Sequence, residues 1–195
     1  MKVMQLLPEL NSGGVERGTL EIARALVQAG HESVVVSHGG RLVSELEAQG
    51  SRHCTLAIHK KSLSSLWQIG PLRQLIVQEQ PDIVHVRSRV PAWLTHFALK
   101  GIPKAQRPHL ISTVHGFYSI NRYSQIMTQA EKVIAVSDSV VDYITQHYKN
   151  CPPQDIVRIY RGIDPNAFPH SYMPSHQWQQ QTWQDFPALK DKFLI

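Results

Sequence analysis

Two adjacent glycines, Gly13 and Gly14, separate an apolar run from an amphipathic run near the start of this 195-residue chain. A glycine turn that opens a helix presents free backbone amides and the positive end of the helix dipole, which together suit a phosphate. The alternative is a tight turn that needs a positive φ and binds nothing. The spacing GGVERG is not the GxGxxG of a dinucleotide site, and His38-Gly39-Gly40 stands where a ribose-binding acid is expected.

Three further side chains could contact a ligand. Arg87 and Arg89 lie at or just beyond the end of a predicted strand, where a pair of arginines can bind a phosphate or carboxylate through forked hydrogen bonds. His115 lies where another strand gives way to a glycine-containing loop, and could hydrogen-bond a ligand hydroxyl or assist proton transfer. The alternative for His115 is a bond to the backbone. His85 alternates with apolar neighbours, so we predict a hydrogen-bonded core histidine there.

Short apolar runs alternate with amphipathic ones along most of the chain. The predicted strands cover residues 3–7, 33–38, 52–58, 82–86, 109–116, 132–137 and 156–160. Helices are predicted after the glycine turn, at 42–48, at 62–78 with a break at Gly70-Pro71, from Pro91, around 123–130 and after Ser137 or Asp138. This order predicts a doubly wound, mostly parallel, Rossmann-like α/β domain over residues 1–168. Ligands of such domains bind at the carboxyl ends of the strands.

The last part of the chain does not follow this pattern. Residues 169–184 are rich in Pro, Gln and Trp and show no helical or strand periodicity, which favours a linker or an arm. The chain then ends on an apolar run typical of a strand that has just begun. We therefore expect residues 169–195 to be a linker and the start of a further, C-terminal domain.

Composition excludes several classes of protein. A net charge of +5 favours phosphates or anionic headgroups, but the basic residues are scattered without interleaved aromatics, so no nucleic-acid partner is predicted. No apolar run approaches the roughly 18 residues of a membrane span, and the N-terminus does not resemble a signal peptide, which predicts a cytoplasmic protein. Neither Cys54 and Cys151 nor the histidines show metal-ligand spacing, so no metal site is predicted.

Residues 59–76 combine lysines and an arginine with leucines and a tryptophan. Such a stretch is usually a helix with one face packed on the sheet. The alternative is contact with an anionic membrane surface, which would make the protein peripheral at the inner face of the membrane.

Five blocks of the chain, in order, resemble the motifs of one known family. They are the opening strand with GGVER, PDIVHVRSR, STVHG, VIAVSDSVVDYI and IYRGIDPNAF. Over residues 1–168 they resemble the N-terminal half of glycosyltransferase family four, retaining enzymes of the two-domain GT-B architecture. The last block is similar to the family's Asn-Gly-Val-Asp-xxx-Phe segment, with Arg161 in place of the asparagine. The HVRSRVPAW form is most similar to bacterial transferases of lipopolysaccharide core or other cell-surface glycans.

The resemblance implies a function and roles for the residues above. Gly13 and Gly14 would approach the diphosphate of a nucleotide-sugar donor, and His115 would bond a hydroxyl of the transferred sugar. Arg87 and Arg89 would contact the acceptor, a glycan or a lipid-linked molecule. The enzyme would be a hexosyltransferase-type glycosyltransferase that acts with retention and, as is general for GT-B enzymes, needs no metal or other cofactor.

In the family, a second domain supplies most donor contacts, including a Glu-x7-Glu motif, and the 195 residues do not contain it. We therefore expect this chain alone to have little or no transferase activity. An alternative is a non-catalytic sugar- or phosphate-binding module completed by a separate donor-binding subunit. A Glu-x7-Glu domain encoded after Ile195 would favour the enzyme. A nucleotide-binding oxidoreductase or epimerase is disfavoured by the missing ribose acid.

Overall fold

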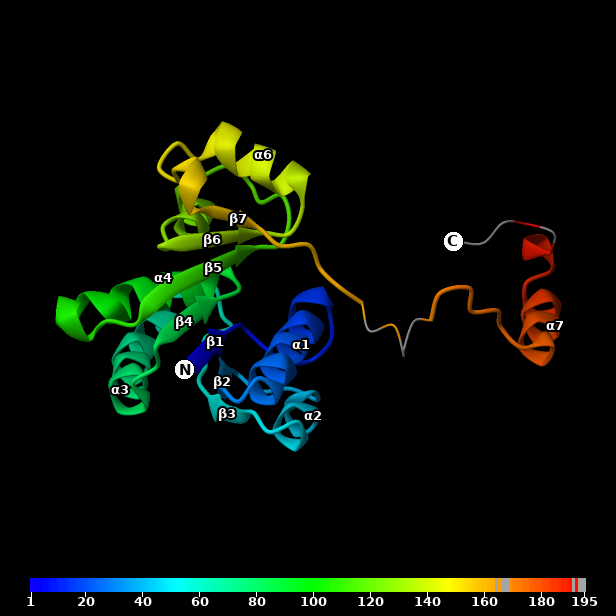
Figure 1. The fold of residues 1–195 in the computed structure, drawn as a ribbon, viewed down its shortest axis with the longest axis horizontal. Helices are drawn as coiled ribbons and strands as arrows, with labels where there is room; N and C mark the ends of the chain where they lie inside the picture. Colours follow the sequence, from blue (N-terminus) through cyan, green and yellow to red (C-terminus); the bar gives the residue numbers. More distant parts are fainter. Residues whose placement is uncertain (164, 166–168, 191, 193–195) are drawn as a thin grey trace. The chain divides into compact units, whose positions relative to one another are not determined.

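The computed structural model describes residues 1–163, 165, 169–190 and 192. Contacts divide the chain into two units, Met1–Arg161 and Gly162–Ile195. The first unit is built on one seven-stranded sheet, ordered β3-β2-β1-β4-β5-β6-β7, in which every neighbouring pair is parallel (Figure 1). The strands are β1 (Lys2–Leu6), β2 (Glu32–Ser37), β3 (Arg52–Thr55), β4 (Ile83–Val86), β5 (His109–Val114), β6 (Lys132–Ala135) and β7 (Ile156–Arg158). The predicted parallel α/β sheet is confirmed.

Helices cover both faces of this sheet, as its parallel strands require. The α-helices of the first unit are α1 (Gly14–Gln28), α2 (Val43–Ala48), α3 (Ile69–Glu79), α4 (Arg89–Lys100), α5 (Arg122–Gln125) and α6 (Asp138–His147). Along β2 the side chains alternate between two cores: Val35 packs with Leu20 of α1 and Leu46 of α2, whereas Val34 belongs to the larger core that includes Leu72 of α3. α1 and α2 therefore lie on one face and α3 and α4 on the other (Figure 1).

Two predicted helix boundaries differ from the structure. The segment expected to be helical over 62–78 is a 3₁₀ helix, η1 (Leu63–Gln68), followed directly by α3. The prediction that a helix begins at Pro91 is wrong by two residues, because α4 begins at Arg89. Proline is tolerated at this third position because the first-turn amides have no partner within the helix. Arg89 is thus a helical residue rather than part of a strand end.

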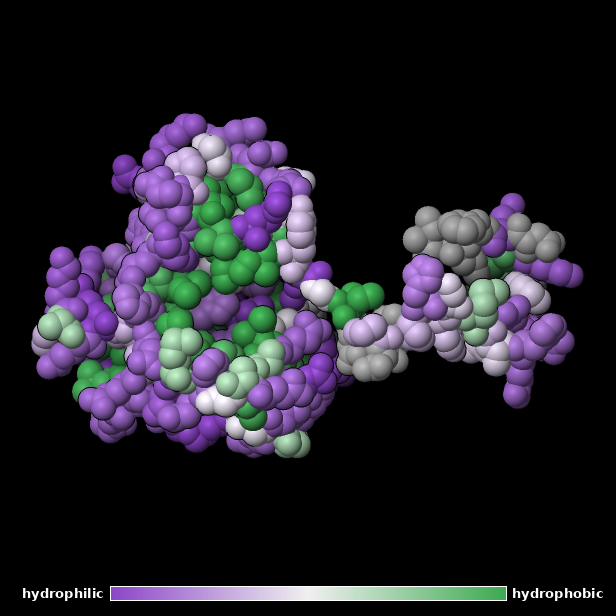
Figure 2. Space-filling model, viewed as in Figure 1, coloured by the Kyte–Doolittle hydropathy of each residue, from purple (hydrophilic) through white to green (hydrophobic). Residues whose placement is uncertain are grey.

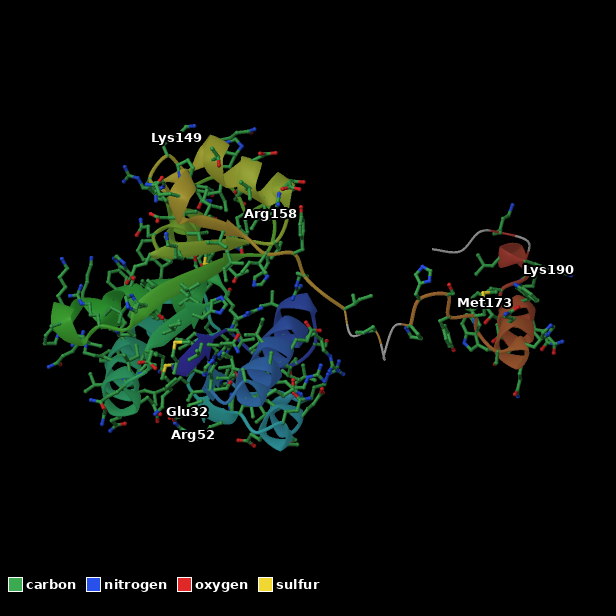
Figure 3. The ribbon with its side chains drawn as sticks, viewed as in Figure 1. Glu32, Arg52, Lys149, Arg158, Met173 and Lys190 are labelled. Carbon is green, nitrogen blue, oxygen red and sulfur yellow. The ribbon has the colours of Figure 1, made fainter. Side chains whose placement is uncertain are left out.

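The last strand of the sheet is short and exposed. β7 has three residues, and hydrophobic side chains gather on the visible surface around β6, β7 and α6 (Figure 2). Arg158 of β7, labelled in Figure 3, forms an ion pair with Asp138 at the start of α6. Ser137 caps that helix by accepting a bond from the Val140 amide at 3.2 Å. A short, charged edge strand resists pairing with other chains.

The second unit contains a helix that the sequence did not reveal. α7 runs over His176–Asp185, and the Ser175 hydroxyl caps it by accepting a bond from the Trp178 amide at 3.2 Å. The linker or arm expected over 169–184 thus includes a helix, although the sequence there shows no helical periodicity. The helix buries no residue, so its side chains lack the apolar periodicity that predicts one. The strand expected at the very end falls largely on residues 191 and 193–195, outside the described residues.

Candidate functional site

A row of polar side chains lies on the α1 face of the central strands. Gln5 of β1 is in register with His85 of β4, and Arg87 and Thr113 continue the row beyond them. All four residues are buried. Burying polar groups costs free energy unless they are hydrogen-bonded. A parallel sheet normally places apolar residues at such positions, so this row marks the part of the sheet where function is expected.

The members of this row bond to one another. His85 Nε2 lies 2.7 Å from Thr113 Oγ1, which confirms the prediction of a hydrogen-bonded core histidine. Arg87 Nη1 donates to Gln5 Oε1 at 3.2 Å, and Gln5 Nε2 donates to the Thr19 carbonyl of α1 at 3.3 Å. The row therefore ties β4 and β1 to the helix that follows the glycine turn.

The Arg161 side chain reaches the polar row from beyond β7, the strand at the edge of the sheet. It follows β7, and its guanidinium donates to the carbonyl of Gly14, 147 residues earlier in the chain. Burial lowers the pKa of Arg87 to about 10, and the positive charge of Arg161 contributes to this lowering. Two guanidinium groups thus stand beside the first turns of α1, where an anion would be stabilised.

The glycine turn at the start of α1 has the geometry that only glycine readily adopts. Gly13 is the N-cap residue with a φ of 146°, and a Cβ there would lie 2.6 Å from Glu16 Oε2. No side chain caps α1 within the described residues. The turn therefore needs glycine for its backbone, and it also leaves first-turn amides of the helix without a side-chain partner.

His115 is held at the carboxyl end of β5 with its ring free. Its backbone amide donates to the Tyr118 hydroxyl at 3.4 Å, whereas neither ring nitrogen has a partner among the described residues, although both are buried. Burial, together with the charges of Arg87 and Arg161, lowers the pKa of His115 to about 3. The imidazole is therefore neutral near pH 7 and offers one donor and one acceptor.

The structure does not use Arg87 and Arg89 as a forked pair. Arg87 is buried against Gln5, whereas Arg89 Nη1 donates to Ser124 Oγ at 3.2 Å. The Arg89 guanidinium also lies over the Tyr118 and Tyr123 rings, at 5.0 and 5.3 Å. The change from strand to helix at Ser88 sends the two side chains to different partners.

The polar row, Arg161 and His115 are together called the polar cluster. Three of its members, Gln5, Thr113 and Arg161, were not predicted as site residues from the sequence. Gln5 is a single polar residue within the apolar run of β1, and this interruption was a usable signal. Arg161 was recognised only as a departure from the asparagine of the family motif. Its contact with Gly14 depends on the path of the chain across the whole sheet and has no local signal.

The burial of His85 predicts that the folded protein loses stability in acid. Burial, with contributions from Arg87 and His115, lowers the pKa of His85 to about 3, whereas an unfolded histidine titrates near 6.5. Between these values the unfolded chain binds the extra proton, so stability is retained above about pH 6.5 and falls as the pH drops toward 3. At pH 5.5 the expected loss is about 1 kcal/mol for His85.

Urea unfolding at pH 7.5 and 5.5 measures this loss. His85→Gln, which keeps a polar partner for Thr113, should lose about 1 kcal/mol less than the wild type over this interval. The exposed His147→Gln should behave as the wild type does. Equal losses in the wild type and in His85→Gln would show that His85 does not stay neutral in the fold.

The described residues form neither a metal-ligand group nor a membrane-spanning helix, and they line cavities away from the polar cluster. No group of three or more His, Cys, Asp or Glu that could hold a metal ion occurs in the part of the chain that the structure describes. None of the helices formed by these residues is long and apolar enough to cross a membrane. Cavities of about 390 and 400 Å³ are lined by residues outside the polar cluster.

Comparison with known proteins agrees with this architecture. A glycosyltransferase from Rickettsia africae ESF-5 is 30% identical, with a TM-score of 0.76 over 97% of this chain and 50% of its own. Anabaena Alr3699/HepE, solved with UDP and glucose, is 21% identical, with a TM-score of 0.68 over 95% and 50%. The lipopolysaccharide outer core galactosyltransferase WaaB is 15% identical, with a TM-score of 0.64 over 84% and 46%. No curated protein matched the chain.

The chain thus spans about half the length of these solved structures. Its parallel sheet has the Rossmann-like fold of the N-terminal domain of GT-B glycosyltransferases. The family model of Glycosyltransferase Family 4 matches residues 12–167, which include the glycine turn, most of the polar row, His115 and Arg161. This chain therefore belongs to Glycosyltransferase Family 4.

Proposed function

We propose that this chain forms the acceptor-side wall of the cleft in a retaining, hexosyltransferase-type glycosyltransferase. In the reaction, the bond between the anomeric carbon and the donor diphosphate breaks, and the acceptor oxygen bonds to that carbon on the same face of the sugar. The proton of the acceptor hydroxyl passes to the departing diphosphate. The observation that carries this proposal is His115, whose two ring nitrogens have no hydrogen-bond partner among the described residues. Its ring also feels the positive charge of Arg161, which bonds to the glycine turn.

The glycine turn is the proposed contact for the donor diphosphate. The first-turn amides of α1 near Gly13 and Gly14 can donate to phosphate oxygens, and the helix dipole favours negative charge there. Arg161, bound to the Gly14 carbonyl, adds positive charge where the diphosphate departs. These groups allow the proposed reaction to proceed without a metal or other cofactor. A nucleotide sugar as donor is supported by HepE, which was solved with UDP and glucose.

His115 is the proposed catalytic residue. A neutral imidazole can hydrogen-bond a hydroxyl of the transferred sugar as donor or acceptor, and its burial makes that bond stronger than it would be in water. The bond between its backbone amide and Tyr118 fixes the start of the loop. The backbone that carries the ring is therefore held before the substrate arrives.

Arg87 and Arg89 are the proposed acceptor contacts. Both have partners inside the fold, so a test of either must separate folding from acceptor binding.

The proposed acceptor is a glycan or a lipid-linked molecule in bacterial cell-surface glycan synthesis. The fold shared with WaaB, which is named as a lipopolysaccharide galactosyltransferase, supports this setting. We place the enzyme in the cytoplasm, in peripheral contact with the inner face of an anionic membrane.

We further propose that residues 1–168 form the acceptor-side domain and that 169–195 lead into a donor-binding domain. The chain alone would then show little or no sugar transfer.

The test of the proposed function uses an enzyme with both halves, supplied with UDP- and GDP-hexoses and an acceptor. We expect release of nucleoside diphosphate in the presence of EDTA and a product with the donor's anomeric configuration by NMR. Sugar binding without any release would favour the non-catalytic module instead.

A further inference from the structure

A second surface, away from the polar cluster, combines exposed apolar side chains with lysines. It lies where η1 follows β3 and faces α4. Leu63 and Trp67 of η1 are 84% and 82% exposed, and Leu66 is 48% exposed. Single exposed apolar residues are ordinary, but three on one short helix are the kind of exposed apolar surface found at interaction sites.

Beside this helix lies a groove with mostly apolar walls. Its volume is about 400 Å³, and its apolar walls are formed by Leu63, Leu66, Val90, Trp93, Phe97 and Tyr123. Trp93 Nε1 donates to the Tyr123 carbonyl at 3.0 Å, so the polar atom of the indole is bonded and its ring is left to form the wall. The groove is therefore built to accept a hydrocarbon group rather than a polar one.

The rim of the groove is basic. Lys60 and Lys61 are both exposed and both line it, and the described lining contains no acidic residue. Lys61 Nζ lies 4.6 Å from the centre of the Tyr123 ring, which keeps the ammonium group at the mouth. An apolar surface with a positive rim complements a bilayer that carries anionic headgroups.

We propose that this surface, the lysine-rimmed groove, docks the protein on an anionic lipid bilayer. Trp67 and Leu63 enter the headgroup region, where tryptophan is favoured, and Lys60 and Lys61 contact lipid phosphates. The groove takes part of one lipid chain. A second copy of this chain is a poorer occupant, because a two-fold contact would bring the lysines of both copies together. The inference deepens the membrane contact proposed above and rests on it, but it requires no sugar transfer.

Co-sedimentation of the 195-residue chain with lipid vesicles tests the proposal. We expect binding to vesicles that contain phosphatidylglycerol and at least tenfold weaker binding to phosphatidylcholine alone. Trp67→Ser should weaken binding about tenfold, as should Lys60→Glu combined with Lys61→Glu. All three side chains are exposed, so these variants should keep the thermal midpoint of the wild type.

Matched controls separate this surface from general effects of charge and hydrophobicity. Trp178→Ser removes another exposed tryptophan, and Lys104→Glu with Lys149→Glu makes the same change in net charge elsewhere. Both controls should bind within twofold of the wild type. Equal losses in the variants and controls would overturn the proposal, as would equal binding to both kinds of vesicle.

Two further measurements separate lipid docking from self-association and from catalysis. A concentration-dependent dimer by light scattering that Trp67→Ser abolishes would assign the surface to a second copy and overturn the proposal. His115→Ala should bind vesicles as the wild type does, because His115 does not line the groove. A loss of sugar transfer in that variant with vesicle binding intact would therefore support separate sites for catalysis and docking.

Discussion

Replacing His115 by alanine is expected to lower kcat about 100-fold in an enzyme that contains this domain and its donor-binding half. The ring nitrogens have no partner among the described residues, so the substitution breaks no hydrogen bond of the fold. The substitution removes a neutral imidazole that can donate one hydrogen bond and accept another at the carboxyl end of β5. Steady-state kinetics with a nucleotide-sugar donor measures the effect, and the thermal midpoint should stay close to that of the wild type.

The exposed His147, on α6, provides the control for this experiment. His147→Ala removes the same chemical group without touching the polar cluster, so its kcat should be unchanged. His115→Gln keeps one amide donor and one acceptor, and it should recover part of the lost rate. Wild-type kinetics in His115→Ala would remove this residue from the reaction.

Arg87→Ala is expected to lower the free energy of unfolding by about 3 kcal/mol. The substitution leaves Gln5 Oε1 without its donor in a buried position, and it empties the space of a large side chain between β4 and α1. Urea unfolding of the purified chain measures the change. Arg122→Ala, at an exposed arginine, should change the free energy of unfolding by less than about 0.5 kcal/mol.

A double variant tests whether the stability lost in Arg87→Ala comes from the broken hydrogen bond between Arg87 and Gln5. Arg87→Met combined with Gln5→Leu replaces both bonded groups by apolar ones of similar length, so it should be more stable than Arg87→Ala. If Arg87→Ala cost less than about 1 kcal/mol, the hydrogen bond from Arg87 to Gln5 would carry little of the stability, and the polar row would not depend on it.

The sheet could be predicted from the sequence because its strands carry a strong local signal. Runs such as Val34–Val36 and the valines of β4 are apolar on both sides, which is typical of strands covered on both faces, and helices follow at regular intervals. Helix α7 had no such signal, since it buries no side chain and begins only at the Ser175 cap. Predictions from burial pattern find only the elements that are buried.

The candidate site could be predicted only in part. Gly13 lies in the connection from β1 to α1, and His115 directly follows β5. Both segments follow the carboxyl end of a strand, where the topology of a parallel sheet already places ligands. The neutral state of His115 follows from its burial and from the charges of Arg87 and Arg161, and these residues lie far apart in the sequence. A sequence pattern shows which residues follow a strand, whereas the electrostatic field at the site depends on how distant segments pack.

We propose that the glycine turn and His115 form one wall of a nucleotide-sugar cleft and that a second domain supplies the other wall. Titration of the 15N-labelled 195-residue chain with UDP- and GDP-hexoses, which carry the sugar proposed to meet His115, tests this proposal by NMR. We expect weak binding, with a dissociation constant of about 1 mM or higher, and shifts centred on the amides of Gly13 and Gly14 and on the ring of His115. Micromolar affinity, or shifts that leave these groups unchanged, would contradict it.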